Sequence, residues 1–396
     1  MATFKNPIST ATRPPVWLLA ICAAIGPMAV TIALPANTQI MQDFDTQYGI
    51  AQLMLTVYLG CMGCALLFTG NLSDRFGRRP VMIIGMGVFA LGSLLTAVSP
   101  SLELMLFGRA IQGFGAATGQ SLARAIVRDL YGRDKAASMI GYITMATLVA
   151  PMLGPGVGGL LTEWMSWRYI FVLLAALATA TIILTWRYMP ETAQVSIHQK
   201  PRLIPSAIVL ARLLSYRAYT FVLIFATGIY WAFQAGAPYL IMEVMRRSPA
   251  EYGMYFFFTA IGYASGNFLS GRYSERAGTD RMLLLALIPL ALGIILFWVF
   301  ADTPHPMALF GPMFLLTISN GMTVPSATAG ALSARPELAG TAAGLTGFLQ
   351  IGIGALITLL VGFIQNGFFW PLLTVVTVCG LLSTGGVVSG RRKNPD

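Results

Sequence analysis

The sequence predicts an all-α membrane protein in which twelve transmembrane helices form two six-helix repeats. Composition is the first observation, because 56% of the 396 residues are hydrophobic and only 10% are charged. Soluble domains carry roughly 25% charged residues. The apolar residues also fall into twelve long runs, and a helix of about 20 apolar residues crosses a bilayer. These observations exclude a soluble enzyme, a disordered protein and a nucleic-acid binder.

The apolar runs divide into two sets of six, separated by a more polar stretch. The expected spans of the N-terminal bundle (1–188) are 16–36, 49–70, 80–99, 103–127, 136–162 and 167–188. Those of the C-terminal bundle (217–396) are 218–245, 251–271, 282–301, 305–331, 337–364 and 368–389. Between the bundles, 189–216 is expected to be a cytoplasmic linker. Its apolar residues, mixed with Arg202 and Arg212, predict a short interfacial helix.

Basic residues predict the orientation of the spans. The chain has 25 Lys and Arg against 15 Asp and Glu, a net charge of +10. With the N-terminus in the cytoplasm, 21 of these 25 basic residues fall in inside loops or at inner span ends, as the positive-inside rule requires. Both termini are therefore predicted to be cytoplasmic. The basic excess reflects topology and does not require a nucleic-acid partner.

A short pattern recurs at the same place in each half. Residues 70–77 read GNLSDRFG and residues 271–278 read GRYSERAG, 201 positions later. Gly, Ser, Arg and Gly match in register, and Asp is replaced by Glu. Parallel six-span repeats are an architecture of secondary transporters, which bind substrate near the bilayer midplane between the halves. The repeat therefore predicts a transporter.

Several segments together resemble one known family across the whole chain. The loop 70–79 resembles the signature loop of the major facilitator superfamily, and 109–115 and 151–159 resemble its fourth-helix and fifth-helix motifs. Segments 124–129 and 236–239 resemble the Bcr/CflA drug-resistance branch. This resemblance implies a multi-pass transporter of the bacterial inner membrane. It would export small drug-like molecules by alternating access and proton antiport, and we expect a functional monomer.

Two of these motifs are expected to control gating. In the loop, the glycines would allow a tight turn, and Asp74 would lie near the positive end of the next helix. The alternative is a solvated loop whose charges only set topology. In span five, small residues allow close helix approach and Pro155 can kink the helix, so packing alone is the alternative to a coupling role. The gating candidates are Gly70, Asp74, Arg75, Gly77, Arg78, Arg79, Gly154, Pro155, Gly158 and Gly159.

Arg109 and Glu243 are the candidate coupling residues. A charge inside a span is costly and points to function by default, although Arg109 could instead snorkel toward the interface near Glu103. The resembled branch has an acid in span one where this chain has Thr31. Glu243 is the best substitute, but helical spacing also suits an ion pair with Arg246.

The mode of coupling is left open by these residues. Glu243 or the mouth residues Asp43 and Asp45 could carry a proton. Alternatively, Arg109 could couple electrostatically while the substrate carries the charge. In a third case, transport is uncoupled or uses another ion.

Polar and aromatic residues in several spans predict a central substrate cavity. The candidates are Thr31, Tyr58, Gln112, Tyr230, Trp231, Phe233, Gln234, Tyr239, Tyr263, Asn267, Asn320, Phe348 and Gln350. Packing or lipid contact is the alternative for each aromatic ring. The sequence shows no metal cluster, catalytic triad or phosphate-binding loop, so neither an enzyme nor a cofactor is expected beyond a proton gradient. The alternative function is a metabolite or organic-anion facilitator, or an uptake transporter, without classical proton coupling.

Overall fold

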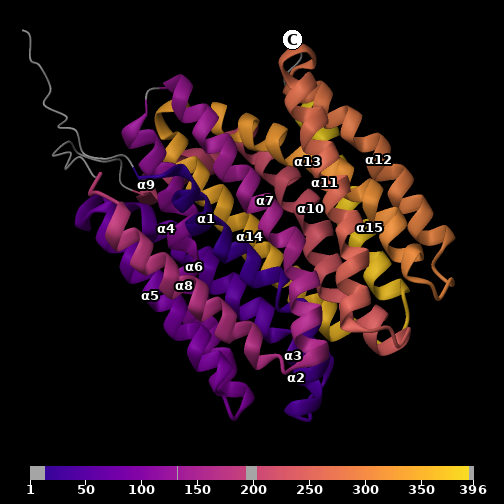
Figure 1. Ribbon diagram of the computed structural model, residues 1–396. Helices are drawn as coiled ribbons and strands as arrows, with labels where there is room; N and C mark the ends of the chain where they lie inside the picture. Colours follow the sequence, from indigo (N-terminus) through magenta and orange to yellow (C-terminus); the bar gives the residue numbers. More distant parts are fainter. Residues whose placement is uncertain (1–13, 132, 193–202, 392–396) are drawn as a thin grey trace, which may run out of the picture.

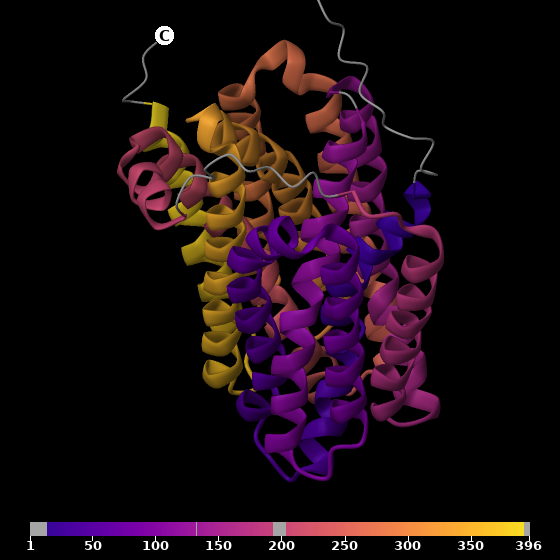
Figure 2. The same cartoon turned by 90° about the vertical axis from the view of Figure 1, so that its left-hand side faces the viewer.

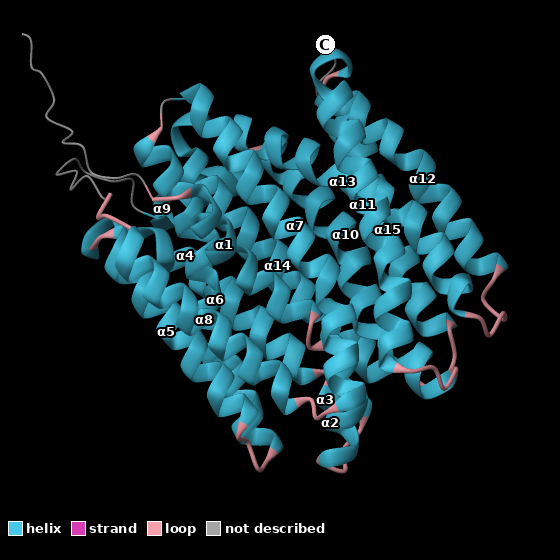
Figure 3. Ribbon diagram, viewed as in Figure 1, coloured by secondary structure: helices cyan, strands magenta, loops and turns pink. Residues whose placement is uncertain are grey.

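The computed structural model describes residues 14–131, 133–192 and 203–391, and these residues contain helices but no strands (Figure 3). The long helices of the first half are α1 Val16–Thr31, α4 Leu53–Phe76, α5 Arg78–Ala97, α6 Leu102–Leu130, α7 Arg133–Trp164 and α8 Arg168–Tyr188. Those of the second half are α10 Leu214–Pro238, α11 Pro249–Ala277, α12 Thr279–Val299, α13 Pro306–Ser333, α14 Ala339–Ile364 and α15 Trp370–Arg391. Short elements are η1 Leu34–Ala36, α2 Asn37–Asp43, α3 Tyr48–Ala51, α9 Leu203–Arg212, η2 Tyr239–Val244 and η3 Pro336–Leu338.

Each of the twelve predicted spans corresponds to one long helix. Within the described residues, ten helices are long and apolar enough to cross a membrane. The exceptions are α6 and α11, which have 29 residues each but are the least apolar of the long helices. Charged residues explain why these two helices are less apolar than the other ten. Helix α6 carries Arg109 inside the span, and α11 ends in Arg272, Glu275 and Arg276.

The two halves use the same helix pairings and lie side by side (Figures 1 and 2). In the first half α4 packs on α6, α5 on α6 and α8, and α1 on α7. The equivalent pairs in the second half are α11 with α13, α12 with α13 and α15, and α10 with α14. Between the two halves, α9 contacts α10 and α14 of the second half.

The signature-loop repeat forms nearly identical turns in the two halves. Helix α4 continues to Phe76 and α5 begins at Arg78, so only Gly77 separates them, with φ of 98°. In the second half Gly278 alone separates α11 from α12, with φ of 80°. Glycine adopts such positive φ values without a steric penalty. The expectation that Gly70 also forms the turn is wrong, because Gly70 lies within α4.

Two interfaces join the halves, and we call them the α4–α14 seam and the α7–α11 seam. Both are tight toward the end of the molecule where α2 and α3 lie, which we call the far end. Where α3 leads into α4 at the far end of the first seam, a Cβ on Gly49 would lie 2.9 Å from the carbonyl oxygen of Gly362. In the second, a Cβ on Gly159 would collide with the carbonyl oxygen of Pro249. Close backbone contact therefore depends on glycine in each seam.

The opposite end, where α9 and the end of α15 lie, we call the terminal end (Figures 1 and 2). Gly344 lies 18 residues, or five turns, before Gly362 on α14, and Gly271 lies five turns after Gly253 on α11. A Cβ on Gly344 or Gly271 would meet no described atom within 4 Å, whereas one on Gly253 would meet the backbone of α7. Among these glycines the closest approaches between the halves therefore lie at the far end, while a Cβ on Gly347, one turn after Gly344, would still meet Leu66 of α4 at 3.6 Å.

Candidate transport site

Arg109 is enclosed by helices of the first half. Its side chain has 0% exposure, and its Nε donates a hydrogen bond to the carbonyl oxygen of Met54 at 3.0 Å. The guanidinium carbon lies 4.2 Å from the ring centroid of Tyr58 and 5.4 Å from that of Phe171. Cation–π contacts of this kind stabilise a desolvated cation. The predicted alternative, snorkelling toward Glu103, does not occur in this structure.

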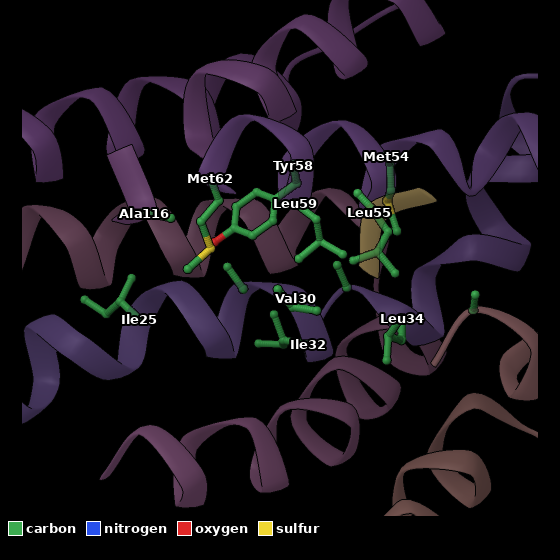
Figure 4. Close-up of a cluster of buried hydrophobic side chains, with 14 of the residues drawn as sticks. Ile25, Val30, Ile32, Leu34, Met54, Leu55, Tyr58, Leu59, Met62 and Ala116 are labelled. Carbon is green, nitrogen blue, oxygen red and sulfur yellow. The ribbon is translucent and has the colours of Figure 1, made fainter. Parts of the chain in front are cut away.

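Two other predicted residues contact Arg109, Gln112 through a hydrogen bond and Tyr58 through its ring. Arg109 Nη1 donates to Gln112 Oε1, and Gln112 Nε2 donates to Ser93 Oγ at 2.7 Å. Tyr58 donates its hydroxyl hydrogen to the carbonyl oxygen of Gly26 at 2.8 Å. Figure 4 shows Tyr58 between Met62 and Leu59, facing the α1 segment that holds Ile25 and Val30. Tyr58 and Gln112 therefore lie inside the first half, where they hold Arg109.

The positive charge of Arg109 is only partly compensated. Its described hydrogen-bond acceptors are a backbone carbonyl and a neutral amide, and its Nη2 is buried without a described hydrogen-bond partner. An incompletely satisfied buried cation costs free energy. Such a group is typical of a functional site rather than of a structural ion pair.

At the terminal end, the gating candidates form a network around the start of α5. Arg78 pairs with Asp74 at 2.7 Å and with Asp129 of α6 at 2.9 Å. The side chain of Arg79 donates to the carbonyl oxygen of Trp186 at 2.6 Å. Arg75 stacks on neighbouring Phe76, 5.2 Å from the ring centroid. The network lies within the first half and ties α4, α5, α6 and α8 together.

Glu191 is a member of this network that sequence reasoning missed. Its carboxylate accepts hydrogen bonds from the backbone N–H groups of Arg78 (2.8 Å) and Arg79 (3.2 Å), at the start of α5. Unpaired N–H groups and the positive dipole end favour a carboxylate at this point of a helix. A Cβ at Gly77 would collide with the same carboxylate. The sequence signal was weak: a single acid just after the sixth span.

The span-five candidates lie on α7, between α1 and α11. A Cβ on Gly154 would collide with the side chain of Thr31, and one on Gly158 with the carbonyl oxygen of Ile32. Gly159 faces Pro249, and the carbonyl oxygen of Pro155 faces Gly253. Thr31, at 2% exposure, therefore packs against α7. One helix thus combines packing within its half and contact across the α7–α11 seam.

The candidates on α10 differ in their surroundings. Phe233 is buried in the second half, where it packs on Phe310 with 5.3 Å between the ring centroids. Gln234 is buried with an Oε1 atom that lacks a described hydrogen-bond partner. Tyr230 and Trp231 are half-buried neighbours, 6.0 Å apart between ring centroids. Phe233 is therefore a core residue in this conformation, Gln234 is buried beside it in sequence, and Tyr230 and Trp231 are partly exposed.

The remaining substrate candidates are spread over three helices of the second half. Asn320 of α13 donates to the carbonyl oxygen of Ala226 at 3.0 Å, and its Oδ1 lacks a described partner. Asn267 of α11 donates to the carbonyl oxygen of Tyr263 within its own helix at 2.9 Å. Phe348 and Gln350 of α14 are half-buried, like Tyr263 and Asn267. Tyr239 and Glu243 lie apart from these residues, on η2 at the far end.

A family comparison decides the resemblance seen in the sequence. Residues 17–359 match the family described as Major Facilitator Superfamily. The chain belongs to the major facilitator superfamily. It is accordingly a multi-pass membrane transporter for small molecules, in the lipid bilayer, and not an enzyme.

Relatives of this superfamily member span nearly its full length. It is 33% identical over 368 residues to multidrug resistance protein D of Escherichia coli K12, covering 92% of each chain. It is 28% identical to a bicyclomycin resistance protein homolog of Haemophilus influenzae, covering 92% of this chain and 93% of the relative. The fold is similar to that of a bacterial homolog of the human lysosomal transporter Spinster in an inward-facing, occupied conformation. That similarity has a TM-score of 0.74 at 15% identity and covers 96% of each chain.

Proposed function

We propose that this protein exports small drug-like molecules across the bacterial inner membrane by alternating access, driven by proton antiport. The names of its relatives, which concern resistance to several drugs and to bicyclomycin, support the substrate class. The placement of basic residues supports cytoplasmic termini. In this assignment the far end is periplasmic and the terminal end is cytoplasmic. The protein acts as a monomer, with residues 1–188 and 217–396 as the two moving units.

The arrangement of the two seams carries this proposal. They are tight at the far end and lack close neighbours at Gly344 and Gly271 near the terminal end. In the proposed orientation this is a conformation closed to the periplasm, ready to load substrate from the cytoplasmic side. Export follows when the far end opens and the network of Asp74, Arg78 and Glu191 meets the second half.

Arg109 is the proposed link to the proton gradient. It is a buried charge whose described partners include no carboxylate, so its electrostatic energy responds to any charge that enters the space between the halves. Glu243 is the proposed second titratable group. The proposed substrate contacts are the half-buried residues Tyr230, Trp231, Tyr263, Asn267, Phe348 and Gln350, together with the unsatisfied amides of Gln234 and Asn320.

Transport by the purified protein in vesicles tests the proposal. Uptake of a panel of labelled antibiotics into inverted proteoliposomes is measured with and without an inward-acidic pH gradient. Proton antiport predicts accumulation that requires the gradient and that a protonophore abolishes. Gradient-independent equilibration would overturn the antiport and favour the facilitator, to which Thr31 at the usual acid position points. Absence of flux for the whole panel, with the protein folded, would overturn the drug-export assignment.

A further inference from the structure

A separate pocket lies at the far end, beside the α4–α14 seam. Its volume is about 430 Å³, within the range of sites for small organic ligands. The second half contributes Tyr239, Glu243 and Gln365, and the first half contributes Gln47 and Tyr48. The pocket therefore spans both halves, away from the interior of the first half where Arg109 lies.

Glu243 brings an incompletely paired carboxylate to this pocket. One of its oxygens lies 4.0 Å from the Arg246 guanidinium, and its side chain is 16% exposed. The other oxygen, Oε1, is buried and has no hydrogen-bond partner among the described residues. Arg246 is 82% exposed, and at 4.0 Å its contact with Glu243 is loose. A buried acceptor of this kind loses the free energy of a hydrogen bond until a donor or cation reaches it.

The backbone around Glu243 is irregular. After Pro238, α10 changes into the π-helical turn η2, and the chain then passes Arg246 with φ of 55°. π-helical turns are rare in proteins, and those that do occur often lie at functional sites. A positive φ in a residue other than glycine is unfavourable. This geometry keeps Glu243 in the pocket while Arg246 remains at its rim.

The other pocket residues suit an organic cation rather than an anion. Tyr48 and Tyr239 lie 4.7 Å apart between ring centroids, one from each half. Aromatic faces beside a carboxylate are a recurrent arrangement for recognising ammonium groups. The Tyr48 hydroxyl donates to the carbonyl oxygen of Ala235, and one N–H of the Gln365 amide donates to that of Gly236, so these two donors are engaged within the protein. The Oε1 atom of Gln365 has no described partner and adds an acceptor.

We propose that this far-end pocket binds small organic ammonium ions, with Glu243 as the counter-ion and Tyr48 and Tyr239 as the aromatic walls. The bound ammonium replaces Arg246 as the partner of the Glu243 carboxylate. Because the pocket includes residues of both halves, its ligand favours the conformation in which the far end is closed. The binding itself does not rest on the proposed export; only the placement of the pocket on the periplasmic side does.

Equilibrium binding to the full-length protein in lipid nanodiscs tests this site. The probe is benzyltrimethylammonium, a permanent cation, and benzyl alcohol is the neutral comparison. Glu243→Gln is expected to raise the Kd for the cation at least about tenfold. Arg246→Ala is expected to lower it up to about fivefold by removing a competing exposed cation. Neither variant should change the binding of benzyl alcohol.

Glu251→Gln is the matched control. Glu251 is a carboxylate near the same end that pairs with Arg247 at 3.8 Å, and it forms a capping box with Ser248 that glutamine can preserve. It should bind the cation like the wild type. Unchanged cation binding in both Glu243→Gln and Arg246→Ala would overturn the proposal, as would equal loss in Glu251→Gln. Because no flux is measured, these outcomes are distinct from a failure of drug export.

Discussion

Arg109 is the residue on which the proposed coupling depends most directly. It stands out in the sequence because so few charges lie inside the spans. Its partners could not be predicted, because Met54, Tyr58 and Phe171 come from two other helices and contribute a carbonyl group and ring faces rather than charges. Glu191 was missed for the same reason, since its partners are backbone N–H groups. Residue chemistry identified the unusual cation, but the three-dimensional contacts were needed to identify its environment.

Replacing Arg109 by Met separates its functional and structural roles. Methionine fills similar space and removes the cost of a buried charge, so the protein should fold and insert normally. Transport should fall at least about tenfold, the factor that corresponds to losing one charge-assisted interaction of roughly 1.4 kcal/mol. Flux is compared at equal amounts of monodisperse protein. A folded variant that transports at the wild-type rate would contradict the coupling role.

Asp74→Asn tests the network at the start of α5. Asp74 pairs with Arg78 at 2.7 Å, and the amide keeps the shape but loses the charge. We expect normal insertion with reduced transport, because in the proposed cycle the gating candidates rearrange when the terminal end closes. Asp302→Asn, an exposed position between α12 and α13, is the control and should transport normally. Equal rates for both variants would argue that Asp74 only sets topology.

At the scale of helices, the sequence predicted the presence of each long helix well and the residues at which the helices end less well. Each predicted span corresponds to a long helix, because length and apolar content are strong signals. The end of α4 was misplaced because 71–76 is polar and resembles a loop, although Gly77 alone makes the turn. The π-helical turn η2 was also unforeseen, since nothing in Tyr239–Val244 distinguishes it from an ordinary helix.

Glycine substitutions on α7 test the α7–α11 seam. A Cβ at Gly159 would collide with the backbone of Pro249, whereas a Cβ at Gly156 would meet no described atom within 4 Å. Overpacking of this kind costs about 1–3 kcal/mol, so Gly159→Ala should lose at least about fivefold in transport rate by opposing closure of the far end. Gly156→Ala should transport like the wild type. Equal activity of the two variants would show that the seam tolerates the extra methyl group.

For the whole molecule, the two-fold repeat was predictable and the conformation was not. The match between 70–77 and 271–278 predicted two related halves, and the turns at Gly77 and Gly278 agree with it. Small residues occur along the full length of the seams, so the sequence is compatible with closure at either end. Contacts between the halves at the far end, such as those at Gly49 and Gly159, distinguish the two when they are set against the open surroundings of Gly344 and Gly271.

Alternation between closed and open far ends is the central claim, and a reversible cross-link tests it most directly. The hydroxyl oxygens of Thr56 (α4) and Thr358 (α14) lie 3.1 Å apart across the α4–α14 seam. The double variant Thr56→Cys/Thr358→Cys, in a background without Cys61 and Cys64, is oxidised in proteoliposomes and its cross-linking is quantified. We predict that drug flux is lost in proportion to the cross-linked fraction and returns after reduction. Full flux through completely cross-linked protein would contradict the account.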